Sequence, residues 1–289
     1  MKKVCAIVMA LCLLLAGLCP ALAEDKTYRI GICQLAPHPA LDAATQGFRD
    51  FLTEKLGDKV VFDEQNAAGE AATCMQIMNS FISEDVDLIM ANATASLQAA
   101  QSATGDIPIL GTAVTDYGVA LDLTCVDGKT GVNISGTSDL APLDQQAAMI
   151  KELFPEAKEV GLLYCSSEAN SAYQIEVMTQ ELTKLGFRCT EFAFSDSSDV
   201  TSMTNTACQN SDVIYVPTDN VVATCAEAIR NVAEVDRVPI IAGEEGACAG
   251  CGVATLSISY YELGRITGEM AVEVLCEGAD ISQMAIRYA

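Results

Sequence analysis

The stretch VGLLYCSSEANS, residues Val160–Ser171, contains the unit on which the fold is built. An apolar run from Val160 to Tyr164 stops at the polar cluster Ser166–Ser171, and a helical pattern then continues to Gly186. This order predicts a buried strand, a loop of small hydrogen-bonding residues and a helix. Because a helix N-terminus presents free N–H groups, such a loop suits a carboxylate or a phosphate. The alternative is that the serines only cap the helix.

A similar unit opens the first half of the chain at Arg29–Gln34, followed by a polar turn and a helical pattern to Gly57. Three ordered matches lie 130, 125 and 131 residues apart, namely Ile30/Val160, Asp87/Asp212 and Pro108/Pro239. The nearly constant offset predicts two copies of one α/β unit. We therefore expect an α/β fold of two doubly wound parallel-sheet lobes that face each other.

Polar clusters follow the predicted strands in both halves, and ligands of open parallel sheets bind at the carboxyl ends of the strands. These clusters should therefore line one cleft between the lobes. They are Gln34–Pro39, Asn92–Ser96, Thr115–Tyr117, Ser166–Ser171 and Thr218–Asn220.

The N-terminus has the pattern of a cleaved signal peptide, residues 1–23. Lys2 and Lys3 precede an apolar run that is too short for a comfortable membrane span, and Ala21-Leu22-Ala23 fits a cleavage site. We expect an exported, periplasmic or otherwise extracytoplasmic protein, with a lipoprotein anchor as the alternative. The net charge of −23 argues against nucleic acid and anionic lipid surfaces as partners.

Ten cysteines remain after the predicted cleavage, an even number that permits disulfides in an exported protein. Cys248 and Cys251 are the one close pair, and a loop disulfide and free thiols both stay open for them. A redox pair is disfavoured because the two cysteines do not open a helix after a first strand. With His38 as the only histidine and no second C-x-x-C, we expect no metal site. We also expect no cofactor.

Two groups of polar residues sketch a site for an α-amino acid. Ser166, Ser167 and Asn170 suit the carboxylate, and Asp219 suits the ammonium group, which a neutral cleft would leave unpaired. For Glu244 and Glu245, two solvated loop acids are the expectation, and one acid facing the cleft is the alternative. His38 is expected to be a structural or ligand-contact residue because it has no acidic partner nearby in the sequence.

Enzyme signatures are absent from the sequence: it has no G-x-S-x-G, no P-loop and no H-E-x-x-H. One enzymatic alternative remains, because Cys33 and Cys165 occupy comparable places in the two halves. Two facing thiols could move a proton at Cα, as in cofactor-free amino acid racemases. A ligand-presenting sensor protein is a further alternative.

The whole mature chain resembles the ABC-transporter substrate-binding proteins of the tryptophan/tyrosine-binding type, a branch of the type I periplasmic binding proteins. Seven ordered motifs carry the resemblance: IGICQ with HPALD, DLIMANAT, TAVTD, SSEANS, YVPTDN, AGEEG and SYYELG. It implies a Venus-flytrap protein, with two lobes joined by a hinge, that closes on an amino acid, often an aromatic one, and delivers it to a membrane permease and an ATPase. We expect the protein to be a monomer. The ligand contacts that it implies are Gln34, Thr94, Thr115, Asp116, Ser166, Ser167, Asn170, Asp219 and Asn220.

The sequence departs from the family's pattern at Cys165, at the Cys248/Cys251 loop and at its end. The chain stops at Ala289, short of the terminal strand and helix that such proteins usually have, so truncation of the reading frame stays open. We expect lobe 1 to comprise residues 24–139 plus 260–278, and lobe 2 residues 140–259 plus 279–289. The chain would cross the hinge near 138–142 and 257–260, with a third crossing near Gly278.

Overall fold

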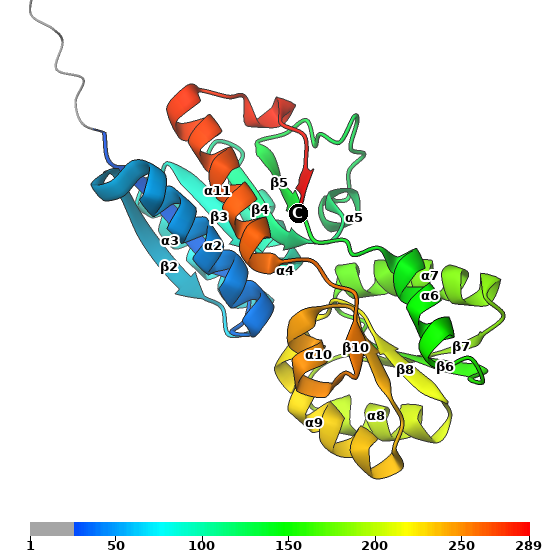
Figure 1. Ribbon diagram of the computed structural model, residues 1–289. Helices are drawn as coiled ribbons and strands as arrows, with labels where there is room; N and C mark the ends of the chain where they lie inside the picture. Colours follow the sequence, from blue (N-terminus) through cyan, green and yellow to red (C-terminus); the bar gives the residue numbers. More distant parts are fainter. Residues whose placement is uncertain (1–25) are drawn as a thin grey trace, which may run out of the picture.

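The structure is a computed structural model that describes residues 26–289. The predicted signal peptide lies outside the described residues. Two α/β lobes are joined by two crossing segments, residues 139–142 and 256–259 (Figure 1). No helix in the described part has the length and apolar character needed to span a membrane.

Lobe 1 has a six-stranded parallel sheet in the order β11-β5-β4-β3-β1-β2. Its strands are β1 (Tyr28–Gln34), β2 (Val60–Asn66), β3 (Leu88–Asn92), β4 (Ile109–Val114), β5 (Ile134–Ser138) and β11 (Arg287–Tyr288). Its helices are α2 (Pro39–Leu56), α3 (Ala71–Ser83), α4 (Thr94–Ala103), α5 (Tyr117–Leu121) and α11 (Tyr260–Glu277), with short 3-10 turns η1 (Gly57–Lys59) and η2 (Ile281–Gln283).

Lobe 2 has a five-stranded parallel sheet in the order β10-β9-β8-β6-β7. Its strands are β6 (Glu159–Cys165), β7 (Arg188–Phe194), β8 (Val213–Val216), β9 (Ile240–Ala242) and β10 (Ala254–Thr255). Its helices are α6 (Leu143–Leu153), α7 (Ala169–Lys184), α8 (Val200–Gln209), α9 (Asn220–Asp236) and α10 (Glu245–Cys251).

The central strands are apolar on both faces because helices cover both faces of each sheet. In lobe 1, Ile30 and Ile32 pack with residues of α2 and α11, whereas Cys33 packs with residues of α3 and α4. In lobe 2, Leu162 faces α6 and α7, and Leu163 faces α8 and α9. The near-continuous apolar runs in the sequence are therefore buried parallel strands.

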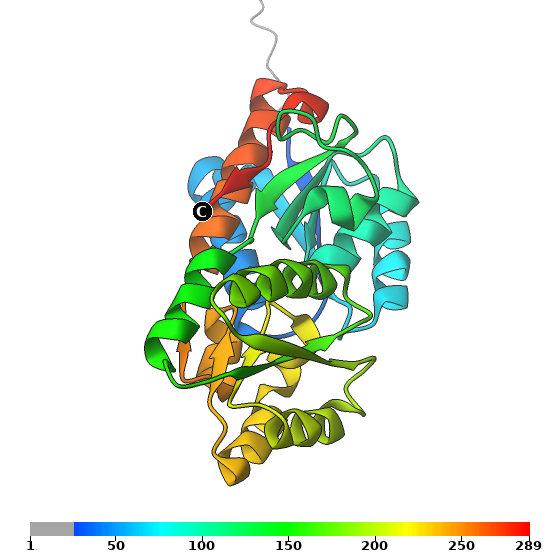
Figure 2. The same cartoon turned by 90° about the vertical axis from the view of Figure 1, so that its right-hand side faces the viewer.

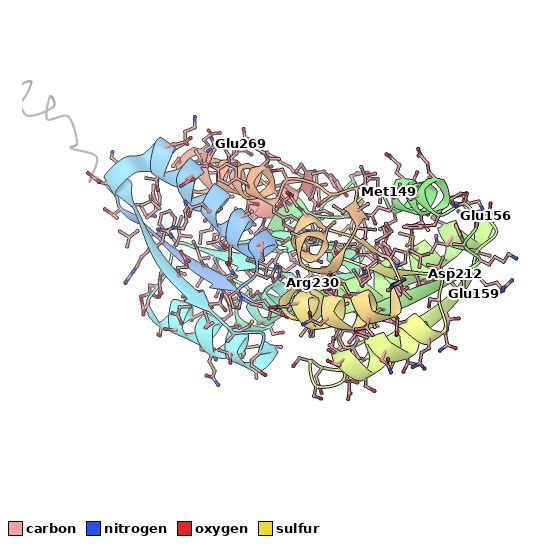
Figure 3. All side chains as sticks on the ribbon, turned by 60° about the horizontal axis from the view of Figure 1, so that its bottom comes forward. Met149, Glu156, Glu159, Asp212, Arg230 and Glu269 are labelled. Carbon is pink, nitrogen blue, oxygen red and sulfur yellow. The ribbon has the colours of Figure 1, made fainter. Side chains whose placement is uncertain are left out.

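The internal repeat predicted from the sequence is confirmed by the strand order. Strands β2-β1-β3-β4-β5 of lobe 1 follow the same order as β7-β6-β8-β9-β10 of lobe 2. The matched aspartates also act alike: Asp87 accepts a hydrogen bond from the backbone N–H of Arg29, and Asp212 accepts one from that of Glu159. Figure 3 shows Glu159 and Asp212 together at the end of lobe 2 that is remote from lobe 1.

The assignment of residues 279–289 to lobe 2 is wrong, and the chain does not cross the hinge near Gly278. Arg287 and Tyr288 pair with Thr137 and Ser138 of β5, so β11 covers an edge of the lobe 1 sheet (Figure 2). Unpaired N–H and C=O groups at that edge favour the added strand. The Ser135 hydroxyl also donates to the carbonyl of Met284, which fastens the tail to lobe 1.

Helix α11 returns to lobe 1 after the second crossing and lies against α2 (Figure 1). Glycines make this close approach possible. A Cβ on Gly264 would lie 2.0 Å from the carbonyl oxygen of Ala44, and one on Gly47 would lie 2.0 Å from that of Tyr261. The packing of these two helices fixes the direction in which the chain leaves the hinge.

Candidate ligand-binding site between the lobes

A small cavity lies where the carboxyl ends of the two sets of strands face each other. Lobe 1 contributes His38 after β1, Thr115 after β4 and Asp139 after β5. Lobe 2 contributes Asp219 after β8 and Glu244 after β9. The fold therefore places the cavity where open parallel sheets bind ligands.

Three carboxylates line this cavity, and none of its lining residues in the described part is a lysine or an arginine. Asp139, Asp219 and Glu244 are each 2% exposed. Burial raises the pKa of all three groups, against the hydrogen bonds that they accept. A cation in the cavity would offset the cost of burying this negative charge.

Neutral donors hold each of the three carboxylates in place. Asp139 accepts from the hydroxyls of Thr115 at 3.0 Å and Tyr260 at 2.9 Å. Asp219 caps helix α9 through the N–H of Val222 at 2.8 Å, and it also accepts from the N–H of Cys165 at 2.7 Å.

Glu244 caps helix α10 by accepting from the backbone N–H groups of Gly246 and Ala247. Its neighbour Glu245 is exposed. The expectation of two solvated acids is therefore wrong for Glu244, because the requirement of α10 for an N-cap turns its side chain inward.

A fourth carboxylate, Glu168, lies beside the cavity at the N-terminus of α9. Its oxygens accept from the backbone N–H groups of Asn220 and Val221, both at 3.1 Å, and from the side-chain amides of Asn220 at 2.8 Å and Asn170 at 3.0 Å. Burial, together with the charge of Asp219, raises the pKa of Glu168 to about 7. The anion site at this helix N-terminus is thus filled by the protein's own carboxylate.

Two side-chain contacts connect the lobes across the cavity. His38 Nε2 lies 3.1 Å from Asn220 Oδ1, and the Gln174 amide makes a longer contact, 3.4 Å, with the Thr115 hydroxyl. Burial lowers the pKa of His38. The imidazole is therefore favoured in its neutral form.

The nine residues predicted as ligand contacts divide into two groups, and their roles stay predictions. Four line the cavity: Thr115, Asn170, Asp219 and Asn220. The other five, which are not among the residues lining it, are Gln34, Thr94, Asp116, Ser166 and Ser167.

Hydrogen bonds within their own lobe explain why most residues of the second group do not line the cavity. The Ser166 and Ser167 hydroxyls donate to the carbonyls of Phe194 and Ser195 beside β7. The Gln34 amide donates to Asp42 and to the Ala36 carbonyl inside lobe 1. Asp116 caps α5 and lines a separate surface pocket, and Thr94 is buried in the first turn of α4.

The two cysteines of the racemase alternative do not face each other across the cavity. Cys33 Sγ lies 3.4 Å from the Ser96 hydroxyl in lobe 1, and Cys165 Sγ lies 3.0 Å from the Ser167 hydroxyl in lobe 2. Neither lines the cavity. The geometry that motivated this alternative is absent from the described residues. Cys248 and Cys251, on α10, are free thiols, as are the other eight cysteines of the described chain.

Sequence reasoning missed Asp139, Gln174, Tyr260 and the inward position of Glu168 as parts of the site. Signals for some of them were present, since Glu168 lies within SSEANS and Tyr260 within SYYELG. Asp139 lies in a predicted crossing segment, where a buried carboxylate was not expected.

Comparison with protein families matches residues 29–288 to the model described as ABC transporter substrate binding protein. The chain belongs to this family. Its match extends over both lobes and both crossing segments.

Similar proteins include one from Clostridioides difficile (strain R20291) named tyrosine-binding protein. It is 39% identical over 266 residues, which are 91% of this chain and 76% of that protein. A solved structure described as an ABC domain from Streptococcus pneumonia in complex with L-Trp superposes with a TM-score of 0.88 at 31% identity, covering 91% of this chain and 90% of that one.

A third relative shows how the lobes are arranged here. The ligand-free, open structure of a substrate binding protein with adhesive properties from Clostridium difficile is 38% identical, covers 91% of this chain and 89% of its own, and has a TM-score of 0.66. The more similar sequence thus gives the poorer superposition. Together with the contacts between the lobes, this difference indicates that the two lobes of this chain are closed upon each other.

Proposed function

We propose that this protein is the extracytoplasmic solute-binding component of an ABC importer and that it binds an amino acid between its lobes, with the aromatic amino acids as the first candidates. The observation that carries the proposal is the cavity itself. Three buried carboxylates at the carboxyl ends of strands, with no lysine or arginine among the described residues that line the cavity, favour a ligand that carries an ammonium group. The ligands named for the two relatives carry such a group.

The ligand's carboxylate would need neutral donors, since no cationic side chain lines the cavity. The backbone N–H groups in the first turn of α2, where Ala40 and Leu41 line the cavity, are placed to supply them. The Asn170 amide also lines the cavity, but it already donates to Glu168 and to the Thr218 carbonyl. Asp219 and Asp139 would hold the ammonium group. The serine pair Ser166 and Ser167 is a weaker candidate for the carboxylate than the sequence suggested, because both hydroxyls are used beside β7.

Binding would stabilise the closed arrangement of the lobes, which a membrane permease with its ATPase could then recognise. The protein would act as a monomer. We expect it to be exported by the predicted signal peptide and to remain outside the cytoplasm.

Thermal unfolding of the exported protein tests this function, after bound solutes are removed by unfolding and refolding. The test compounds are the twenty amino acids, sugars and nucleosides. A ligand at a hundred times its Kd should add about 2.7 kcal/mol to the free energy of unfolding, a shift of several degrees. The decarboxylated and deaminated analogues of each hit serve as controls and should bind more weakly. A response to a sugar or a nucleoside alone would overturn the amino acid, and no response at all would overturn solute binding.

A further inference from the structure

His38, the one histidine of the chain, has a buried nitrogen without a partner beside the cavity. Its side chain is 7% exposed and lines the cavity at the start of α2. Nε2 contacts Asn220 across the lobes, but Nδ1 has no hydrogen-bond partner. A buried polar atom without a partner is costly unless something satisfies it.

The orientation of the Asn220 amide decides which histidine nitrogen carries the proton. Asn220 Nδ2 lies 2.8 Å from Glu168 Oε2, and this oxygen also accepts from the backbone N–H of Asn220 at 3.1 Å. Glu168 Oε2 is therefore an acceptor, and the amide nitrogen must point toward it. Asn220 Oδ1 is then directed at His38 Nε2 and can only accept a hydrogen bond. His38 therefore carries its proton on Nε2.

In the neutral ring, Nδ1 is consequently an acceptor with a free lone pair. A ligand carboxylate or carbonyl at this place would face that lone pair and be repelled. An ammonium group would be attracted, both by the lone pair and by the carboxylates in the same cavity. The acceptor thus distinguishes between the two ends of an amino acid.

From this chain of contacts we infer that His38 Nδ1 accepts a hydrogen bond from the ligand's ammonium group, and that Glu168 and Asn220 position His38 for this contact. The inference rests on the proposed function and deepens it, because it names an acceptor in lobe 1 for the ligand's ammonium group, beside the N–H groups of α2 that would hold the neighbouring carboxylate. Asn220 reaches His38 from the other lobe, so the acceptor is oriented when the lobes are closed.

Nitrogen NMR of the untagged, ¹⁵N-histidine-labelled protein tests the inference directly, because the chain has a single histidine. The probes are L-tyrosine and L-tryptophan, or any other amino acid that the unfolding assay finds. In the ligand-bound protein, the proton should be on Nε2, and the Nδ1 resonance should move in the direction of an accepted hydrogen bond. A proton on Nδ1, or an Nδ1 resonance that binding leaves in place, would overturn the inference.

Two variants provide an independent measurement of affinity. The amide of His38→Asn reaches the place of Nδ1, whereas the amide of His38→Gln reaches the place of Nε2. We expect His38→Gln to lose about 10- to 100-fold in affinity, as for a lost hydrogen bond to a charged group, and His38→Asn to lose less. The reverse order would mean that the ring acts only through Asn220. Melting temperatures without ligand check that both variants fold.

The two proposals fail in distinguishable ways. If an amino acid binds while Nδ1 stays unchanged, solute binding stands and the role of His38 falls. If no amino acid changes either the melting temperature or the Nδ1 resonance, both proposals fall.

Discussion

The Tyr260 hydroxyl donates a hydrogen bond of 2.9 Å to Asp139 Oδ2, and the two residues lie at the two places where the chain passes between the lobes. Asp139 follows β5 at the first crossing, and Tyr260 begins α11 after the second. Both also line the cavity. One buried contact therefore joins the hinge to the candidate site.

Replacing Tyr260 with Phe should lower the free energy of unfolding by about 1–2 kcal/mol, because a buried carboxylate loses one of its two side-chain donors. It should also weaken ligand binding, since Asp139 becomes free to turn away from the cavity. Denaturant unfolding and calorimetric titration measure the two effects. Tyr261→Phe is the matched control, since that hydroxyl donates to Asp50 in lobe 1. Equal ligand affinities for the two variants would contradict the link between hinge and site.

Asp219→Asn should cost about 1–3 kcal/mol of stability even without ligand. Both oxygens of Asp219 accept from backbone N–H groups, and an amide offers only one acceptor, so one buried donor would face an NH₂ group. The measurement is the midpoint of urea unfolding. Asp116→Asn alters the cap of α5, which is less buried, and should cost less. A variant as stable as the parent would show that Asp219 is not the acceptor for Cys165 and Val222.

Glu168→Gln should change how stability depends on pH. The pKa of Glu168 is raised from 4.5 to about 7, so the folded state binds its proton more tightly than the unfolded state does. Its contribution to stability is fully present below pH 4.5 and is lost as the pH rises through 7. Asp139, Asp219 and Glu244 contribute with the same sign, whereas His38, with its lowered pKa, contributes with the opposite sign.

The difference in free energy of unfolding between the parent and Glu168→Gln, followed as a function of pH, measures the contribution of Glu168 alone. When the pH rises from 4.5 to 7, the free energy of unfolding of the parent should fall by about 1–3 kcal/mol more than that of the variant. Urea unfolding at several pH values measures the difference, with the exposed Glu152→Gln as a control that should follow the parent. Parallel curves for parent and Glu168→Gln would contradict the raised pKa.

Gly264→Ala should destabilise the protein by about 1–3 kcal/mol, because its methyl group would enter the backbone of α2 at Ala44. Gly105→Ala is the control, since a Cβ there meets nothing within 4 Å. Thermal unfolding of both variants provides the comparison. If the two melting temperatures agree, the close packing of α2 and α11 is not what holds the second crossing in place.

Much of the fold could be predicted from the sequence because parallel α/β units leave local signals. The run Val160–Tyr164 became β6, and the three matched pairs became the same strand order in two lobes. Predicted ligand contacts that come shortly after a strand in the sequence, such as Thr115 and Asp219, also line the cavity. These features depend on residues close together in the sequence.

Tertiary structure alone decided where the short polar side chains point and where the tail lies. Ser166 and Ser167 turn to carbonyls near β7, residues 28 positions away, and β11 pairs with β5. The contacts of Asp139 with Tyr260, and of His38 with Asn220, join residues 121 and 182 positions apart. Hydrophobic periodicity records which residues are buried, but the partner of a buried polar group depends on how distant segments pack, and no local pattern encodes that.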